Sequence, residues 1–344
     1  DKCWYDNSQS KCIKKKSRED FLRERREQQE QQERKRIDKL FKFVIVRVTH
    51  KNERFLQYLG EQLVERCDRV YLPKKLIQRQ INIVLELQKM LQTKIPDLIL
   101  EPYGSLVQGL TSSSRDIDVS VKWNGIISNK DNQLLLKKHL EELGFSCRTI
   151  DITKKGRIIY LITFKYKGID IDLSLNNEVA VKNSNMIKKI LEDDVISYIL
   201  KIIKLFTKVN GLNNNINIEG KKYYLFNSYT WNIIVLFFLN KINQSEFGKS
   251  KEIIIARLII SIIRFFKEII NKDIFKNGYY TINYSTNEMT FTKKRQTDRD
   301  KVKKGGINRL IVKPPVETYR ETLTDNVNQR AHYKYMADQI NEVT

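Results

Sequence analysis

The stretch that decides the fold is Tyr103-Gly-Ser-Leu-Val-Gln-Gly-Leu-Thr-Ser-Ser-Ser-Arg-Asp-Ile-Asp-Val119. It joins a short apolar segment, Leu98 to Leu100, to a second one, Ile117 to Val121. Short apolar runs of this kind are typical of buried strands. Because side chains alternate along a strand, Asp116 and Asp118 share one face and the residue between them points into the core. The stretch therefore predicts two strands, the second of which begins with two neighbouring carboxylates.

Two carboxylates held this closely repel each other unless a cation lies between them, and their hard oxygen ligands suit Mg²⁺ or Mn²⁺. A third acid is expected from Asp170-Ile-Asp172, in the apolar run Ile169 to Leu175 that predicts a neighbouring strand. Three such acids can hold two ions about 4 Å apart for an in-line phosphoryl transfer. The pattern therefore predicts a site for divalent metal ions.

The small residues before the acids suit a phosphate-binding turn. Gly104 lets the backbone approach a triphosphate closely, and the Ser105 hydroxyl and nearby N–H groups can donate to it. Taken singly, these pieces fit an ordinary turn and a solvated strand end equally well, because a lone pair of carboxylates is common.

The segments around this stretch predict a small mixed sheet with flanking helices. Apolar residues recur at helical spacing from Phe55 to Leu91, with a break at Leu72-Pro73. A further helix is expected at 131–143, capped by Gly144, and strands at 148–152 and 157–165 about a turn at Lys155-Gly156. The nucleotide-binding turn and the acids would lie within this sheet.

Beyond Asn185 the pattern is almost wholly helical. Val195 to Val209, Tyr229 to Leu239 and Lys251 to Ile270 are the clear helices, and 210–220 and 293–306 are expected to be loops. We therefore predict an α+β fold with a small mixed-sheet catalytic domain and a helical domain. The expected boundaries are 1–54 for a basic, largely helical extension, 55–185 for the catalytic domain and 186–344 for the helical domain.

The composition points to a polyanionic partner. The 344 residues carry a formal net charge of +22, with 41% hydrophobic residues for buried cores. Nucleic acid is the default partner and an anionic membrane the rival. The best spanning candidate, Ile253 to Ile270, contains Arg257 and Arg264, which are costly in hydrocarbon, so we expect no membrane segment. The charged run from about Lys14 to Lys39 suits a solvated or an RNA-facing helix.

The four cysteines are scattered without the close pairs of a zinc site or of a disulfide framework. We therefore expect a reducing compartment: cytoplasm, nucleus or mitochondrion. The chain begins at Asp1 rather than Met, which is consistent with the removal of an upstream segment such as a transit peptide.

The stretch from Tyr103 to Val119 resembles the Gly-Ser…Gly-Leu…Ser-Asp-Ile-Asp-Leu signature of noncanonical poly(A) polymerases and terminal uridylyltransferases, within the DNA polymerase β-like superfamily. Asp172-Leu-Ser-Leu-Asn-Asn177 resembles the family's Asp-Ile-Ser-Phe-Asn-Asn. The resemblance implies that Asp116, Asp118 and Asp172 are the catalytic metal ligands, and that Asp170 stays outside the metal site.

Less specific matches to the family's motifs follow in the helical part of the chain. Asn183-Ser184 is similar to the family's Asn-Thr at the nucleotide sugar, and Lys204 and Lys208 resemble the lysines that hold the triphosphate. Asn227-Ser-Tyr229 resembles Ser-Ser-Tyr, which implies that Ser228 meets phosphate and Tyr229 stacks on the base. The plain alternatives are a basic solvated helix face for the lysines and a core aromatic for Tyr229.

The chain departs from the family near its C-terminus. Leu310-Ile-Val-Lys-Pro-Pro315 lies where the family has Ile-x-Asp-Pro, so Lys313 replaces an acid, and Asp325 stands where uridylyltransferases carry a His before Asn-Val. A preference for UTP therefore does not follow. His332 is nearby, but a lone His is more often structural. Arg115 replaces a Ser and either pairs with the carboxylates or binds phosphate.

The sequence thus predicts an RNA 3′-terminal nucleotidyltransferase that adds AMP or UMP from ATP or UTP to single-stranded RNA, with protein partners in an RNA-processing or ribonucleoprotein complex. The alternative of a different class is a catalytically weak or inactive nucleotidyltransferase fold that serves as an RNA-binding assembly component of a ribonucleoprotein, such as a mitochondrial ribosome. The charge and the altered C-terminal segment favour this alternative, and the three acids oppose it. A metabolic nucleotidyltransferase that binds no nucleic acid is a third possibility, which the charge disfavours.

Overall fold

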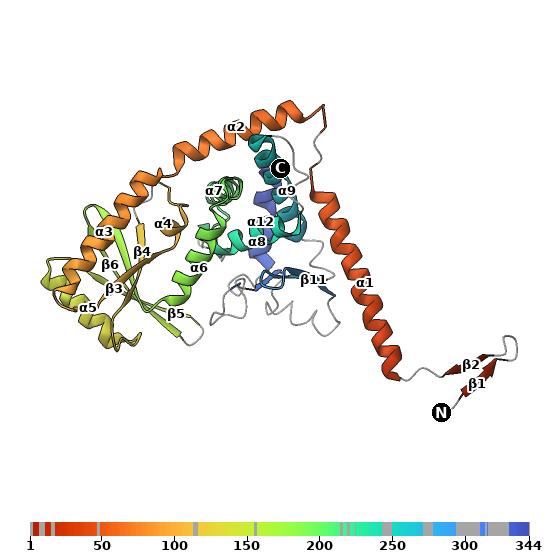
Figure 1. Ribbon diagram of the computed structural model, residues 1–344, viewed down its shortest axis with the longest axis horizontal. Helices are drawn as coiled ribbons and strands as arrows, with labels where there is room; N and C mark the ends of the chain where they lie inside the picture. Colours follow the sequence, from red (N-terminus) through yellow and green to blue (C-terminus); the bar gives the residue numbers. More distant parts are fainter. Residues whose placement is uncertain are drawn as a thin grey trace.

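The computed structural model describes residues 3–6, 11–14, 18–46, 49–112, 116–154, 157–213, 216–218, 221–223, 225–242, 250–270, 278–293, 310–313, 315 and 330–343. Figure 1 shows a sheet domain and a helical body, with a long helix projecting from the body. The predicted α+β fold class is confirmed.

A five-stranded mixed sheet forms the first domain, in the order β3-β4-β7-β6-β5. Its strands are β3 (Ile99–Tyr103), β4 (Asp116–Lys122), β5 (Arg148–Lys154), β6 (Arg157–Tyr166) and β7 (Ile169–Leu175). Only the pair of β4 and β7 is parallel among these neighbours. The strands predicted between 98 and 175 are confirmed, and the predicted turn at 155–156 lies outside the described residues.

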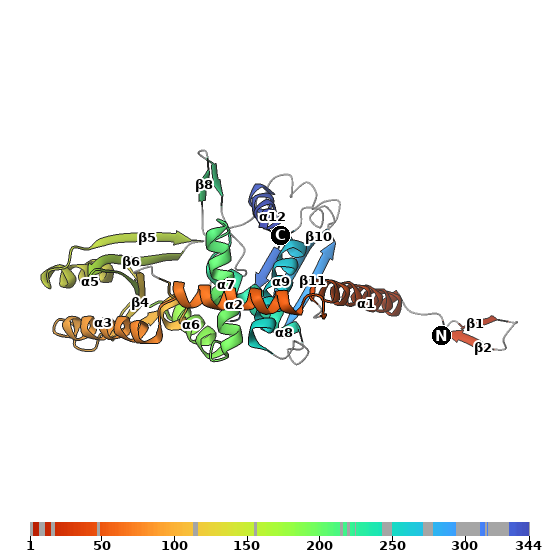
Figure 2. The same ribbon diagram turned by 90° about the horizontal axis from the view of Figure 1, so that it is seen from above.

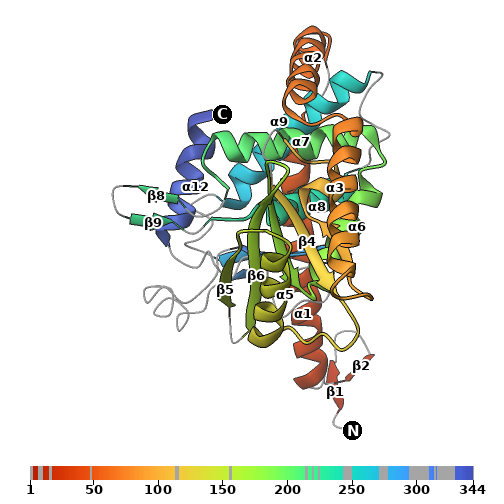
Figure 3. The ribbon, with the colours of Figure 1, turned by 90° about the vertical axis from the view of Figure 1, so that its left-hand side faces the viewer.

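Helices α3 (Lys74–Gln92) and α5 (Lys130–Glu142) cover one face of this sheet (Figure 3). Their buried residues Leu87, Leu91 and Leu136 pack in one core with the strand residues that alternate away from the acids, such as Ile117 and Leu173. The Asn129 side chain caps α5 by accepting from Asn132 N–H at 2.9 Å. The opposite sheet face is thereby left for the polar residues of β4 and β7.

The helical body is built from α6 (Glu178–Ile190), α7 (Asp194–Val209), α8 (Ser228–Lys241), α9 (Lys251–Ile270) and α12 (Arg330–Val343). Every residue of α8 from Thr230 to Leu239 is buried, as expected for a helix that is apolar on all sides. The three helices predicted in this region are confirmed. Helix α6 was not predicted from the sequence.

Helix α1 (Arg18–Val44) has two parts. From Glu19 to Arg36 its residues are exposed or partly exposed, as the sequence predicts for a charged helix, and this part projects from the molecule (Figure 1). The helix continues beyond the predicted end at Lys39, and Ile37, Leu40, Phe41 and Val44 enter the core of the helical body. The Phe41 ring lies 5.7 Å from that of Phe238.

Helix α2 (Glu53–Val70) leads from the helical body to α3, and the predicted break at Leu72-Pro73 separates the two helices. Its main partner is α9: Gly60 packs so closely that a Cβ atom there would lie 2.1 Å from the carbonyl oxygen of Glu252. Cys67 and Tyr71 also belong to the core of the helical body. The segment 53–71 therefore packs with the helices, although the sequence assigned it to the catalytic domain.

Smaller sheets complete the fold. β10 (Gly278–Asn283) pairs with β11 (Glu288–Lys293) in antiparallel and with β12 (Leu310–Lys313) in parallel orientation. β1 (Cys3–Asp6) and β2 (Lys11–Lys14) form an N-terminal hairpin, and β8 (Ile216–Ile218) and β9 (Lys221–Tyr223) form a hairpin that protrudes beside α12 (Figure 2). This second hairpin corrects the predicted loop at 210–220, because three residues on each side pair.

The apolar helix α9 lies within the protein core. Arg257 is buried and its Nε donates to the carbonyl oxygen of Val46, whereas Arg264 is exposed. The described part of the chain contains no helix with the length and apolar character needed to span a membrane.

Candidate active site

The turn after β3 brings a glycine against an acid. Gly104 has φ 70° and ψ −148°, a conformation that favours glycine, and it precedes the short helix α4 (Ser105–Gln108). A Cβ atom at Gly104 would lie 2.5 Å from Oδ2 of Asp118. Tyr103 is also the cross-strand partner of Asp118. The predicted phosphate-binding turn and the predicted metal-binding strand are therefore in contact.

The predicted acids lie side by side on two parallel strands. Asp118 is in register with Asp172, and Asp116 with Asp170. Burial raises the pKa of Asp118 to about 6, with added repulsion from Asp172 and Asp116, while Lys204 acts in the opposite direction. Burial also raises the pKa of Asp172, and Asp116 and Asp170 contribute. The three predicted metal ligands therefore share one face and interact electrostatically.

Asp170 differs from the other three acids in its surroundings. It lies at the exposed end of β7, where its Oδ1 lies 3.7 Å from Nζ of Lys165. An ion pair at this exposed position partly neutralises its charge. This arrangement agrees with the expectation that Asp170 stays outside the metal site.

The chemistry of the donor set fits a divalent cation, because carboxylate oxygens on adjacent strands are the ligands that Mg²⁺ and Mn²⁺ accept. Burial is the main cause of the raised pKa values of Asp118 and Asp172, and repulsion between neighbouring acids adds to it, so a bound cation would favour the charged forms. Among the described residues, no three acidic, histidine or cysteine side chains already surround a common point.

Lys204 approaches the acids from α7. Its Nζ donates to the carbonyl oxygen of Leu110 at 2.8 Å, in the loop after α4. Burial lowers its pKa to about 8, Lys208 acts in the same direction and Asp118 opposes. Lys208 lies one helical turn further and is exposed. The two predicted phosphate-binding lysines thus lie at different depths, with only Lys204 next to the acids.

The predicted phosphate- and sugar-binding residues bind one another in this structure. Gly104 N–H donates to Oγ of Ser184 at 2.8 Å, and Ser184 is 3% exposed. The Ser105 Oγ accepts from Oγ1 of Thr111 at 3.2 Å. The Tyr229 hydroxyl donates to Oδ1 of Asn183 at 2.7 Å. The turn, α6 and the start of α8 are therefore joined around the predicted nucleotide site.

Tyr229 and Ser228 lie at the beginning of α8. Burial raises the pKa of the Tyr229 hydroxyl, which packs at the edge of the helical core. The Ser228 Oγ accepts from Nδ2 of Asn213 at 2.7 Å. The capping residue Asn227 accepts from Thr230 N–H and so fixes the first turn of α8. Both the core and the nucleotide-site interpretations of Tyr229 are compatible with this position.

The sequence did not single out a hydrogen-bonded group beneath the acids. The Tyr103 hydroxyl lies 3.1 Å from Oγ of Ser174 and accepts from Nδ2 of Asn177 at 3.4 Å. Burial raises the pKa of Tyr103 to about 12, and Asp118 adds to this effect. The Asn177 N–H donates to Oγ of Ser120. These contacts join β3, β4, β7 and the start of α6 directly beside Asp118 and Asp172.

The residues that depart from the family pattern lie elsewhere. Lys313 is an exposed residue at the end of β12, and His332 is buried in α12 with its ring 6.1 Å from that of Tyr223. His332 is thus a core residue. Arg115 and the segment 325–328 lie outside the described residues.

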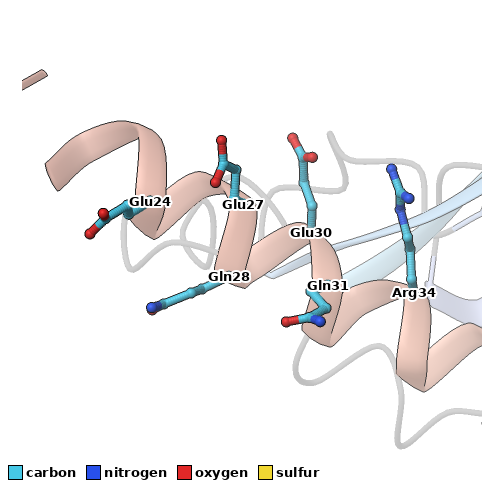
Figure 4. Close-up of a pocket in the computed structure, with 6 residues that line it drawn as sticks. All are labelled: Glu24, Glu27, Gln28, Glu30, Gln31 and Arg34. Carbon is cyan, nitrogen blue, oxygen red and sulfur yellow. The ribbon is translucent and has the colours of Figure 1, made fainter. Parts of the chain in front are cut away.

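A hollow far from the acids is lined by side chains of the projecting part of α1 (Figure 4). It has a volume of 470 Å³, and its lining residues are Glu24, Glu27, Gln28, Glu30, Gln31 and Arg34. None of these six described lining residues is apolar, and the hollow lies on the side of the molecule opposite the sheet domain (Figures 1 and 4). It therefore has no part in the candidate active site.

Known proteins support this assignment of the fold. A search of curated protein sequences gave no match. Similar solved structures include a cytoplasmic RNA terminal U-transferase, with a TM-score of 0.61, 14% identity and coverage of 83% of this chain and 92% of that chain. The Cid1 poly(U) polymerase with MgGTP has a TM-score of 0.63 at 14% identity, over 85% of this chain and 94% of that chain. Cid1 with its short product ApU has a TM-score of 0.60 at 15% identity, over 83% and 92%.

The family comparison concerns the sheet domain. Residues 59–192 match the model for the central palm domain of mitochondrial-like poly(A) RNA polymerases. This range contains β3 to β7, the Gly104 turn and all three acids. The match therefore covers the sheet and the predicted site residues on it, and the solved structures share its fold.

Proposed function

We propose that this protein is a template-independent RNA 3′-terminal nucleotidyltransferase, which transfers AMP or UMP from ATP or UTP to the 3′ end of a single-stranded RNA. The observation that carries the proposal is the pairing of Asp118 with Asp172 in register, beside Asp116 and in contact with Gly104. The family match of the palm domain and the fold shared with Cid1 poly(U) polymerase support it.

The proposed mechanism assigns the acids to the metal ions. Asp116 and Asp118 would hold the ion that accompanies the nucleotide, and all three acids would hold the second. When bound, the ions activate the RNA 3′-hydroxyl and neutralise charge at the α-phosphate as pyrophosphate leaves. Because burial raises the pKa of Asp118 to about 6, a neighbouring cation would stabilise the charged form of this carboxylate.

Basic and polar residues around the acids position the nucleotide. The charges of Lys204 and Lys208 attract the triphosphate, and the Gly104 turn with Ser105 donates to it. Asn183 and Ser184 lie next to this turn and suit contacts to the sugar and phosphates. Tyr229 offers its ring to the base. Nucleotide binding replaces the hydrogen bonds that these side chains make with one another in this structure.

The charge of +22 suits RNA binding through phosphate contacts with little reading of sequence. We infer that protein partners in an RNA-processing or ribonucleoprotein complex select the RNA to be extended. The compartment we propose is a reducing one: cytoplasm, nucleus or mitochondrion.

A second candidate function is an RNA-binding assembly component of a ribonucleoprotein that keeps the nucleotidyltransferase fold without its activity. The observation that favours it is Lys313, an exposed residue at the end of β12, which stands where the resemblance implies an acid. It predicts RNA binding without nucleotide addition.

A primer-extension assay separates the two functions. The wild-type protein, a labelled RNA primer, Mg²⁺ or Mn²⁺ and each NTP in turn should give extended products. Asp118→Asn should lower the rate by at least about a thousandfold, because a metal ligand contributes several kcal/mol to transition-state stabilisation. Asp172→Asn should have a similar effect.

The matched control is Asp151→Asn. Asp151 lies on β5 of the same sheet, where its Oδ2 accepts from Lys130 at 2.8 Å, away from the proposed site. Asp151→Asn should keep wild-type activity. Circular dichroism should show that Asp118→Asn, Asp172→Asn and Asp151→Asn are all folded. Full activity of Asp118→Asn would refute the assignment of the site. RNA binding without extension by any NTP would support the second candidate.

A further inference from the structure

A groove of 940 Å³ lies where the palm domain meets the helical body. Its walls come from α3, β3, α4, α6 and α7. Figure 1 shows these elements near the junction of the sheet domain and the helical body. None of the described residues that we assign to metal or nucleotide binding lines it. The groove is therefore a separate feature of the surface.

The floor of the groove is aliphatic. Leu100 and Leu106 are buried at its base, and Ile77, Ile81 and Val107 are partly exposed above them. Covering aliphatic side chains that are open to water lowers the free energy and so favours binding of a ligand. The floor therefore suits apolar side chains of a ligand.

The rim of the groove carries basic residues without acidic partners. Lys74 lies on one wall and Lys188 and Lys201 on the other, and none of the three forms an ion pair with any residue that the structure describes. The Nζ of Lys201 lies 5.9 Å from the ring centre of Tyr71 and 5.2 Å from that of Tyr198. Three ammonium groups are thus available to a ligand.

The acidic residues of the groove are largely neutralised within the protein. Glu101 pairs with Lys122 at 2.6 Å and Asp194 with Lys251 at 3.4 Å. Glu192 is the third acidic residue among the described residues that line the groove. The groove therefore favours an occupant with negative charge.

Strand addition at the neighbouring edge of the sheet is blocked. β3 is an edge strand, but its Leu100 N–H donates to Oε1 of Gln88 at 2.8 Å, and Pro102 has no N–H. An occupant of the groove has to bind through its side chains instead.

We propose that the groove docks a segment of a partner protein that combines apolar side chains with aspartates or glutamates. The apolar side chains cover the floor, and the carboxylates meet Lys74, Lys188 and Lys201. Single-stranded RNA fits less well, because it binds through aromatic faces. Tyr198 is the one aromatic residue among the described lining residues, and the ammonium groups of Lys201 and Lys251 already lie over its ring.

A peptide selection tests this proposal without relying on catalytic activity. Random dodecapeptides displayed on phage are selected on the full chain and counter-selected on the variant K74E/K188E/K201E. The surviving peptides should be enriched in Asp or Glu together with Leu, Ile or Phe. A synthetic peptide of this set should bind the variant at least about tenfold more weakly than wild type in fluorescence anisotropy.

The matched control variant is K89E/K138E/K334E. It changes the net charge by the same amount at three exposed lysines outside the groove, and it should bind the peptide within about twofold of wild type. If the triple groove variant fails to fold, K74E/K188E serves instead, because both lysines are exposed. Equal weakening by the control variant, or selected peptides without acidic residues, would overturn the proposal. Competition of a short oligoadenylate for the selected peptide would assign the groove to RNA instead.

Discussion

At the scale of single residues, the candidate site depends on the absence of a side chain at Gly104. Both the positive φ of 70° and the 2.5 Å approach of Asp118 exclude a Cβ atom. The residue therefore fixes how closely the proposed phosphate-binding turn approaches Asp118, a proposed metal ligand. Among the glycines that the structure describes, Gly125 also has a positive φ, of 75°, but nothing lies within 4 Å of its missing side chain.

We expect Gly104→Ala to lower kcat/KM for the NTP by about a hundredfold, because the methyl group displaces the Asp118 carboxylate and misplacement of a catalytic group by about 1 Å has an effect of this size. Gly125→Ala is the control. It should cost about 1–2 kcal/mol of stability through backbone strain but leave kcat/KM unchanged. Primer-extension kinetics and thermal unfolding measure both quantities, and equal kinetic losses in the two variants would contradict the role of Gly104.

Lys204 predicts a pH dependence. With its pKa lowered to about 8, its charge is present below that pH and is lost above it. Since kcat/KM reports the free enzyme, kcat/KM for the NTP should fall as the pH rises through about 8. The folded protein favours neutral Lys204, so this group makes the protein more stable as the pH rises through the same range. Deprotonation of Lys204 therefore does not favour unfolding, so unfolding does not explain the expected fall in activity.

The variant that checks this prediction is Lys204→Arg. A guanidinium stays charged at these pH values, so the fall above about pH 8 should disappear even if the maximal rate is lower. Lys208→Arg, at the exposed position one turn away, should keep the wild-type profile. An unchanged fall in Lys204→Arg would assign the titration to another group.

The sequence predicts the position of the acids well but not their neighbours. Strand alternation alone places Asp116 and Asp118 on one face, and the register with Asp172 agrees with this expectation. The contact of Tyr103 with Ser174 depends on which strands pair and in what register, and this information is not local in the sequence. The hydrogen bond between Gly104 and Ser184 is likewise not local: the turn predicts a role for Gly104, but Ser184 was recognised only by resemblance.

At the scale of elements, α2 and α9 pack through a small residue. The main chain of Glu252 lies against Gly60, with 2.1 Å between the oxygen and an added Cβ atom. Backbone cannot move aside as a flexible side chain can. The contact holds the helix that connects the body to α3.

We expect Gly60→Ala to destabilise the protein by about 1–3 kcal/mol or more, because overpacking forces the two helices apart. Gln62→Ala, at an exposed position of the same helix, should stay within about 0.5 kcal/mol of wild type. Chemical denaturation measures both changes. A stability of Gly60→Ala equal to that of wild type would mean that α2 and α9 are not held this closely.

The helices differ in how readily the sequence predicts them. α8 and α9 are long and apolar, and their pattern is clear. The sequence did not predict α6 because one of its buried positions is polar. Val181, Ser184 and Ile187 have helical spacing, but Ser184 interrupts the apolar pattern. It also follows β7 after only Asn176 and Asn177, and Asn176 makes the turn with a φ of 48°.

At the scale of the whole molecule, two cores divide the chain differently from its sequence order. The core of the palm domain contains residues from Val84 to Leu175, whereas residues of α1 and α2 pack with the helices that come last. Amphipathic periodicity shows that a helix buries one face but does not identify the partner of that face. The domain boundaries at 54 and 185 therefore could not be read from pattern alone.

The net charge of +22 makes a prediction for the whole molecule, because it attracts RNA through all of its surface rather than through one residue. Neutralised phosphates release counterions, so affinity for single-stranded RNA should fall with salt at a log–log slope of about −0.7 for each phosphate bound. With about four phosphates in contact, the KM for an RNA primer should rise roughly fiftyfold between about 50 and 200 mM KCl. The kcat, measured at saturating primer, should change little, because saturation removes the dependence on RNA binding and salt screens the partly buried site only weakly. A KM that is independent of salt would contradict electrostatic binding of the RNA. A partner protein would then be required to hold the primer.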